Sequence, residues 1–316
     1  MVTDLKLAKK LLFHNSDKLA FIIGNGINRY AYKSTELDTS WSALLLKAWK
    51  GASYTTLSSI DSGITFTEFY DIMELESNSK DVIKSIINDI RGWDKTDYHR
   101  RLYASFQRLN LPVLTTNFDM LLESVHSNKH IIKHPYISAG FTSYYPWNVV
   151  YTDSSDFELH DIYGFGIWHI NGMIEYPSSL KLSLSSYTRQ SKRAIEFLHT
   201  KSLDDDFSGK NTKSLDDDFS GKNKSEWRGM NTWLHLIFNC DLCIFGLGLD
   251  EQEIFLRWLL IERMKYFRKN PEKKRRGWYI CKKKELTSGK QFFLEKIGFE
   301  IIELKSYKEI YEGLML

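Results

Sequence analysis

The chain of 316 residues is long enough for one large α/β domain, or for a core with a helical insertion. Hydrophobic residues make up 42% of it and charged residues 26%, which excludes a disordered protein. A net charge of +3 gives no overall field that would require nucleic acid or an anionic membrane as a partner. The basic run at 269–276 is interpreted as a solvated loop, with phosphate contact as the alternative.

The cysteines indicate the compartment. Cys240, Cys243 and Cys281 are too few for a disulfide framework, which predicts a reducing, cytoplasmic setting. Cys240 and Cys243 have metal-ligand spacing, but no second pair follows and both lie in an apolar segment, so no metal site is expected. No secretory signal is visible in the first residues, and no segment is long and apolar enough to span a bilayer.

In chain order, a short amphipathic helix is predicted over 5–14. The apolar residues of 21–23 then run straight into Gly24, Asn25 and Gly26. Continuous apolar strands are typical of parallel sheets, and glycines at a strand's carboxyl end let the backbone approach a pyrophosphate. Because the third glycine of a full dinucleotide fingerprint is missing, an ordinary strand and turn is the alternative.

The rest of the chain alternates between strand and helix patterns. Helices are predicted over 41–49, 65–90 with a break near 77–79, 98–109, 188–199, 227–239 and 250–267. Strands are predicted over 112–119, 167–174, 180–186, 241–249, 278–282 and 300–304. The alternation predicts a Rossmann-like α/β fold with a doubly wound, mostly parallel sheet, and the helix-rich stretch at about 52–110 is interpreted as a helical insertion.

Two segments depart from this alternation. Residues 129–163 show no regular period and are expected to form loops with short strands. The sequence KSLDDDFSGKN occurs at 201–211 and again at 213–223. Two copies do not make a repeat architecture, so 201–223 is interpreted as a duplicated acidic surface loop.

Four predicted strands end in groups that suit a binding site. The segments 115–119 and 169–171 are polar, whereas 24–26 and 246–248 are glycine turns. In a doubly wound sheet these strand ends meet at one edge, which is where such sheets bind ligands. The sequence therefore predicts a dinucleotide site with reactive polar side chains beside it.

The order and spacing of these motifs resemble those of the sirtuin-like NAD-consuming domains, in particular their bacterial branch in anti-phage defence. The matching motifs are GNGIN from Gly24, WSALL from Trp41, TTNFD from Thr115, WHING from Trp168 with the following PSSLKLSLSSY, and FGLGLD from Phe245. The resemblance covers most of the chain and implies a single NAD-binding domain over 1–316. It implies an NAD+ glycohydrolase (NADase), acting as an NAD-depleting effector without a metal.

The resemblance also implies roles for individual residues. Asn117 would handle the nicotinamide ribose and the attacking water, and Asp119 would help hold the nicotinamide end. The phosphates would lie near Gly24, Asn25 and Gly26, with Ile27, Asn28 and Thr116 from the same motifs, and the adenosine half near Gly246, Gly248 and Asp250. A homo-oligomer, a regulatory partner protein, or both are expected as partners besides NAD.

Two departures from the family pattern leave alternatives open. Asn171 stands where the family usually has a histidine that acts as base or orients the ribose. His169 shares a strand face with Asn171 but lies about 6 to 7 Å back along the strand, so it is an alternative base. The chain could thus be a weakened hydrolase, or a module that binds NAD or ADP-ribose without turnover. The missing zinc-ribbon cysteines disfavour a protein deacylase.

Each of these side chains also has a purely structural interpretation, without a role in binding or catalysis. Asn117 or Asp119 could cap a helix that starts at Met120. Asn171 could belong only to a turn with the following glycine, and His169 could be a satisfied core histidine. Asp250 could be a first-turn acid on a helix.

Overall fold

The structure, a computed structural model, describes residues 5–13, 18–53, 55–77, 79–126, 130–133, 141–153, 162–199, 227, 229–230 and 232–314. The duplicated segment 201–223 lies outside these residues. Within the described residues, no helix combines the length and the apolar character needed to cross a membrane.

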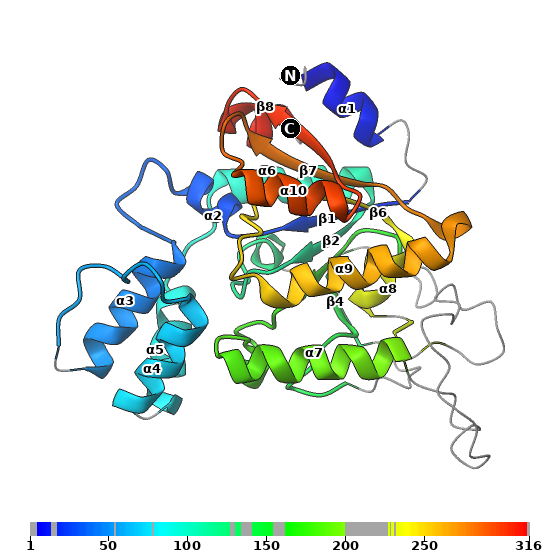
Figure 1. Cartoon of the computed structure of the whole chain (residues 1–316). Coiled ribbons are helices and arrows are strands. Elements are labelled where there is room, and N and C mark those ends of the chain that lie inside the picture. The colour runs from blue at the N-terminus through cyan, green and yellow to red at the C-terminus, as the bar shows by residue number, and fades with distance from the viewer. Residues whose placement is uncertain are drawn as a thin grey trace, which may run out of the picture.

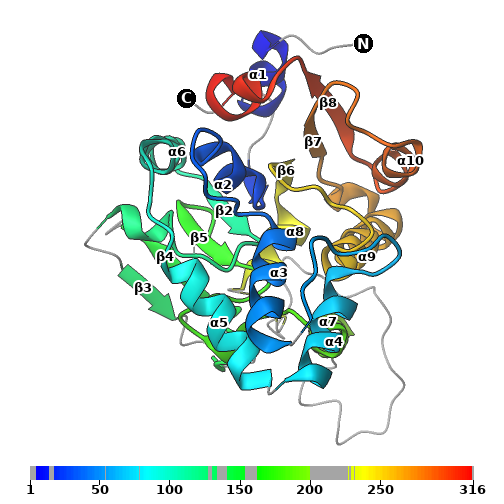
Figure 2. The same ribbon diagram turned by 90° about the vertical axis from the view of Figure 1, so that its left-hand side faces the viewer.

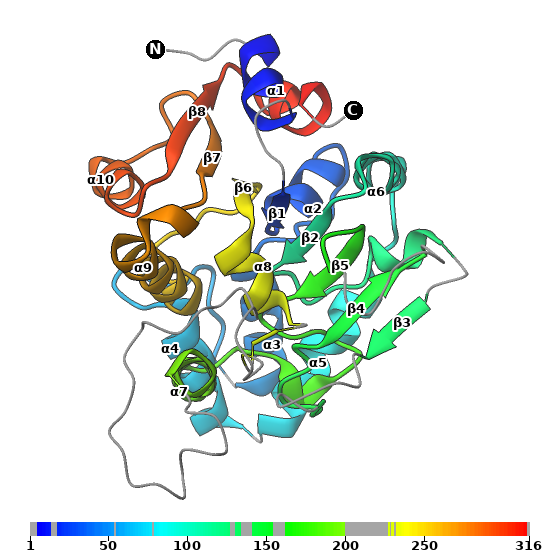
Figure 3. The same ribbon diagram turned by 90° about the vertical axis from the view of Figure 1, so that its right-hand side faces the viewer.

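One sheet organises the chain and confirms the predicted α/β fold. Its eight described strands are β1 (Leu19–Ile23), β2 (Pro112–Thr115), β3 (His130–Lys133), β4 (Val149–Thr152), β5 (Gly166–His169), β6 (Asp241–Phe245), β7 (Gly277–Lys282) and β8 (Glu300–Leu304). They lie in the order β3-β4-β5-β2-β1-β6-β7-β8, which Figure 3 shows from one end of the fan to the other. The six neighbouring strands β5, β2, β1, β6, β7 and β8 are parallel. Strand β4 is antiparallel to both of its neighbours, β3 and β5.

The strand order places a topological switch at the centre of the sheet. The chain leaves β1 for β2 on one side and later returns from β5 to β6 on the other side of β1. The carboxyl ends of β1 and β6 therefore border the crevice in which doubly wound sheets bind ligands.

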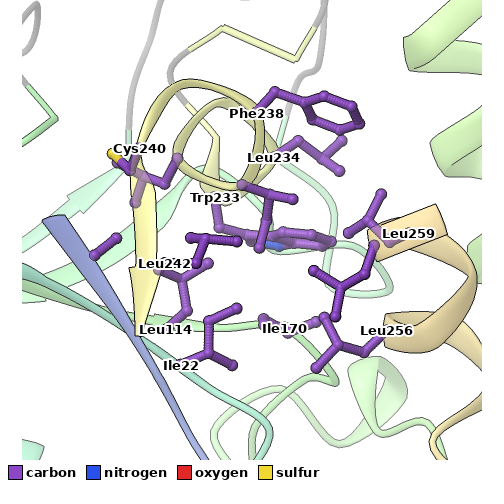
Figure 4. Close-up of a cluster of buried hydrophobic side chains, with 14 of the residues drawn as sticks. Ile22, Leu114, Ile170, Trp233, Leu234, Phe238, Cys240, Leu242, Leu256 and Leu259 are labelled. Carbon is purple, nitrogen blue, oxygen red and sulfur yellow. The ribbon is translucent and has the colours of Figure 1, made fainter. Parts of the chain in front are cut away.

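Helices lie on both faces of the sheet and beside it. They are α1 (Leu5–Phe13), α2 (Gly26–Ala31), α3 (Trp41–Ala52), α4 (Phe66–Glu76), α5 (Ser79–Arg91), α6 (Asp97–Leu109), α7 (Leu184–His199), α8 (Trp233–Asn239), α9 (Ile254–Lys269) and α10 (Ser288–Lys296). Alternating residues of β1 point to opposite faces, as strand geometry requires. Ala20 and Ile22 join a core with α8 and α9, whereas Phe21 and Ile23 join a core with α1 and α6. Figure 4 shows the first of these cores, with Trp233 lying between the strands and α9.

Helices α3, α4 and α5 form a separate group beside the sheet (Figure 1). They share their own apolar core, in which Leu45, Met73 and Ile86 are buried. Helix α6, by contrast, buries Leu102 and Phe106 against the sheet. The group with its own core thus spans α3 to α5, whereas the expected insertion was 52–110.

The strand predicted over 180–186 is wrong. Leu180 and Leu182 are buried against the α3–α5 group, which explains their alternation, but no strand lies alongside to pair with them in the described structure. The backbone N–H of Ser186 donates to Ser183 Oγ at 3.0 Å, and α7 begins at Leu184. A serine that satisfies first-turn N–H groups favours a helix start over a strand.

Candidate functional site

Two glycine turns meet at the carboxyl ends of β1 and β6. The backbone N–H of Gly26 donates to the carbonyl of Gly246 at 2.7 Å. A Cβ atom at Gly26 would lie 2.6 Å from that carbonyl oxygen, so the close approach of the two turns itself requires glycine. Gly246 has a φ of +64°, which also favours glycine. Gly24 is buried beneath the neighbouring Leu247 side chain.

A cleft of about 640 Å³ opens at these turns. This volume is in the range of small-molecule and cofactor sites. Helix α3, whose first residues Trp41 and Ser42 line the cleft, faces the viewer in Figure 2. The predicted residues that line the cleft are Asn25, Gly26, Thr116, Gly246, Gly248 and Asp250. Ile27 and Asn28 lie elsewhere: Ile27 is part of the apolar core and Asn28 is fully buried beneath the turn. These two side chains therefore support the turn.

Charged side chains surround the cleft. Asp250 forms an ion pair with Lys290 across it, and Lys282 lies 3.4 Å from Glu285. Arg29 is exposed at the cleft and has no carboxylate within ion-pair distance among the described residues. Arg29 is the cation best placed to meet a phosphate, since it has no ion pair to break. No local pattern in the sequence indicates this role of Arg29.

A buried polar network fixes the turn after β1. Asn28 Nδ2 donates to Asp119 Oδ2 at 2.7 Å and to Asn25 Oδ1 at 3.1 Å. Asn25 Nδ2 donates in turn to the carbonyl of Thr39 at 2.6 Å. Asp119 also accepts from the backbone N–H of Leu121 at 3.1 Å, so its carboxylate holds the protein's own groups. Burial, together with the charge of Glu123, raises the pKa of Asp119.

His99 belongs to the same network and was missed by the sequence analysis. Its Nδ1 accepts the backbone N–H of Thr96 at 3.0 Å, which leaves the proton on Nε2. Nε2 then donates to Asn28 Oδ1 at 3.1 Å. Burial lowers the pKa of His99 to about 4, so the ring is neutral. Its position at N3 of α6 resembles an ordinary capping residue, which hid this contact to Asn28 in the sequence.

His169 is held by hydrogen bonds at both ring nitrogens. Nδ1 donates to the carbonyl of Asn117 at 2.9 Å, and Nε2 donates to Glu123 Oε1 at 2.8 Å. Both ring nitrogens can donate at once only in the imidazolium form, which a carboxylate at Glu123 stabilises. Burial acts to lower the pKa of His169, but the charge and hydrogen bond of Glu123 outweigh it and raise the pKa. With no free nitrogen, His169 positions the strand end that carries Asn117 and is unsuited to act as the base.

Asn117 lies immediately beyond β2. Its backbone N–H donates to Thr115 Oγ1 at 3.0 Å, and its side chain lines a small cavity with Asn25, Trp41 and Asp119. Residues 116–120 form no helix; the next helical turn is the 3₁₀ segment Glu123–Val125. The interpretation of Asn117 as the cap of a helix that starts at Met120 is therefore wrong.

Asn171 faces a cavity of about 60 Å³ that adjoins the cleft. The cavity and the cleft share five lining residues: Trp41, Phe66, Thr116, Gln252 and Glu253. Asn171 is 3% exposed, and its Oδ1 has no hydrogen-bond partner in the described structure. Gly172 adopts a φ of +92°, and a Cβ atom added there would lie 2.2 Å from the Ser179 carbonyl oxygen, so the turn after Asn171 requires glycine. A buried, unpaired amide oxygen is suited to a ligand hydroxyl.

Glu253 is a further candidate that the sequence did not single out. It lies at the N-cap of α9 and lines both the cleft and the cavity. Burial and the charge of Asp250 raise the pKa of Glu253 to about 7. A carboxyl group with this pKa can exchange a proton near neutral pH. In the sequence it is one of several acids before an apolar helix, and that pattern ordinarily marks a helix start.

The described residues contain no group of three histidine, cysteine, aspartate or glutamate side chains that could hold a metal ion. Cys240 and Cys243 are buried free thiols, and burial raises the pKa of Cys240 to about 12. Comparison with known proteins assigns no function, because no protein-family model and no curated protein matches the chain. A function for the chain is therefore inferred from the chemistry of the site residues.

Proposed function

We propose that the chain binds NAD in the cleft and hydrolyses the bond between its nicotinamide and its ribose. The observation that carries the proposal is the meeting of two glycine turns and Thr116 at one cleft, with the unpaired amide of Asn171 in an adjoining cavity. The pyrophosphate would lie near Gly26 and Arg29. The adenosine half would lie near Gly248 and Asp250.

The reaction needs little acid help, because nicotinamide is a good leaving group. The bond from ribose to nicotinamide breaks through an oxocarbenium-like state, and nicotinamide leaves with the bonding electron pair. Asn117 would position the attacking water, and Asn171 would accept a hydrogen bond from a ribose hydroxyl. Glu253 would take the proton released by the water. Asn171 can hydrogen-bond that ribose hydroxyl but cannot take its proton near neutral pH, as a histidine there could, so turnover should be slow.

The wider role follows from the same proposal. An enzyme of this kind would deplete NAD in the cytoplasm of an infected bacterium, as an effector of anti-phage defence. A homo-oligomer or a partner protein would regulate it.

A binding module without turnover is the second candidate. It is favoured by one observation: the histidine beside the site, His169, has both ring nitrogens engaged and cannot replace the missing base. Measuring nicotinamide release with and without an acetylated peptide separates the candidates. A hydrolase releases nicotinamide without the peptide, a deacylase only with it, and a binding module in neither case.

The substitution Gly248→Trp tests the location of the NAD site. Gly248 is exposed in the cleft, and an added Cβ would meet only the movable carboxylate of Asp250. An indole there should fill the cleft without disturbing the core. We expect calorimetry to show NAD affinity at least about tenfold lower, with an unfolding free energy within about 1 kcal/mol of the parent.

Gly51→Trp is the matched control, because Gly51 lies in α3 with open space around it and does not line the cleft. It should bind NAD as the parent does. Unchanged NAD affinity in Gly248→Trp would place the ligand elsewhere, and no saturable binding by the parent chain would refute the proposal.

A further inference from the structure

A second cleft, of about 500 Å³, lies between the α3–α5 group and α7. Its lining includes Tyr70, Tyr144, Lys181, Arg189 and Arg193, none of which lines the first cleft. Helices α4 and α7 lie next to each other below the sheet in Figures 1 and 2. The second cleft shares Tyr70, Lys181 and Leu182 with the cavity that contains Asn171, but it shares no lining residue with the first cleft.

Lys181 is the unusual feature of this second cleft. The residue is 5% exposed, and its Nζ donates to the carbonyl of Tyr144 at 2.9 Å. Nζ also lies 4.7 Å from the centroid of the Tyr145 ring. No carboxylate lies within ion-pair distance of it among the described residues. A buried charge without a counterion is costly, and an ammonium group can donate three hydrogen bonds.

The charge of Lys181 favours an anion as its ligand. Burial, assisted by the charge of Arg189, lowers the pKa of Lys181 to about 8. The ammonium is therefore still the main form at pH 7. An anion bound beside it would restore the lost charge compensation, and the pKa of Lys181 would rise.

The surroundings of Lys181 are mostly cationic and hydroxylic. Arg189 and Arg193 lie on α7, with Arg193 Nη1 3.0 Å from Glu196. Glu74 is the acid that lines the cleft, and it lies beside the Tyr70 phenol, whose pKa its charge helps to raise. The hydroxyls come from Ser178, Ser183, Ser185 and Ser186. Ser178 and Ser186 donate to the carbonyls of Ser143 and Ser183, and the hydroxyls of Ser183 and Ser185 lie 3.1 Å apart. Two or three cations suit a dianion such as phosphate better than a single carboxylate.

An aromatic surface completes the second cleft. Tyr144 is 61% exposed at its edge, and Tyr70 is buried in its wall. Exposed aromatic rings stack with planar ligand groups. The volume of the cleft is in the range that encloses a ligand of nucleotide size.

We propose that the second cleft binds a nucleoside monophosphate, with its phosphate beside Lys181 and Arg189 and its base against Tyr144. This inference does not depend on the proposed NAD hydrolysis. It uses a different cleft, which meets the cavity of Asn171 at Lys181 and Tyr70, and none of the residues to which the proposed hydrolysis assigns a role.

Calorimetry with AMP tests this inference. The parent chain should bind AMP saturably, and Lys181→Met should weaken binding at least about tenfold. Because Lys181→Met removes an uncompensated buried charge, the variant should fold and be at least as stable as the parent without ligand. Arg189→Gln alters an exposed residue and should weaken AMP binding without changing stability. Lys192→Met, on the exposed side of the same helix, should bind as the parent does.

Three further arms locate the ligand and identify its parts. AMP binding should survive Gly248→Trp, since that change blocks only the first cleft. Adenosine and inorganic phosphate should each bind at least about tenfold more weakly than AMP. Equal AMP affinity in the parent and Lys181→Met, loss of binding in Gly248→Trp, or no saturable binding by the parent would each overturn the inference.

Discussion

Replacing Glu123 with glutamine is expected to lower the free energy of unfolding by about 3 to 5 kcal/mol, the usual cost of breaking a buried ion pair. Glu123 and His169 are both buried, and their 2.8 Å contact is the charge compensation of the imidazolium. Removing the carboxylate leaves a histidine that must lose its proton or stay charged in the core. Urea denaturation at pH 6 should show the change as a lower transition midpoint.

The matched control is Asp81→Asn, which breaks the exposed ion pair between Asp81 and Lys84. Exposed pairs contribute little, so this change should stay within about 1 kcal/mol of the parent. Glu123→Gln combined with His169→Gln should recover part of the loss, because two neutral amides can pair without a buried charge. A Glu123→Gln variant as stable as the parent would show that the pair is not an ion pair.

The same pair should give the protein a characteristic pH dependence. The pKa of His169 is raised in the folded chain, above the value near 6.5 that it has when unfolded. Its stabilisation is therefore complete below about pH 6.5 and is lost as the pH rises through the folded pKa. In Glu123→Gln the charge and hydrogen bond of the carboxylate are lost, whereas the hydrogen bond to Asn117 and the charge of Asp119 still oppose burial, so the folded pKa of His169 should fall and stability should depend less on pH in this range. Parallel urea titrations from pH 5.5 to pH 8, a window set by those directions, would detect the smaller loss of stability with pH in the variant.

Asn171→His should raise nicotinamide release at least about tenfold at saturating NAD, since general bases contribute about 10² to 10⁴ in rate. The side chain at 171 already faces the cavity, and its Oδ1 has no protein partner that the change would break. An imidazole there can take a proton, which an amide cannot. Single-turnover and steady-state measurements of nicotinamide would give the rate.

Asn117→Ala in the Asn171→His background should remove the gain while NAD binding persists, because Asn117 acts on the water and not on the ligand's phosphates. Gln190→His is unsuitable as a control for an added histidine, because Gln190 Nε2 donates a hydrogen bond to the Ile170 carbonyl at 2.8 Å, which the change would break. Lys192→His, which places an imidazole on the surface, is suitable and should leave the slow rate unchanged. A parent chain that is already fast, and a rate that depends on Glu253 alone, would remove position 171 from the mechanism.

The sequence by itself determined where the central strands lie along the chain. Runs such as those of β1 and β6 are apolar on both sides, and only a strand covered on both faces buries such a run. Local caps also determined helix starts: Ser40 accepts the Ala43 N–H, and Thr65 forms a capping box with Glu68. These signals lie within a few residues, so one sequence contains them fully.

The tertiary structure alone decided which polar groups are free to meet a ligand. Glu123 lies 46 positions from His169 in the sequence, and no local pattern shows that it hydrogen-bonds to Nε2 of this histidine. A catalytic base would need that nitrogen free. Lys181 reads as the polar position of an alternating strand, yet it is buried because α7 and the α3–α5 group enclose it. Burial and long-range hydrogen bonds set charge and proton affinity, and both depend on residues brought together only by folding.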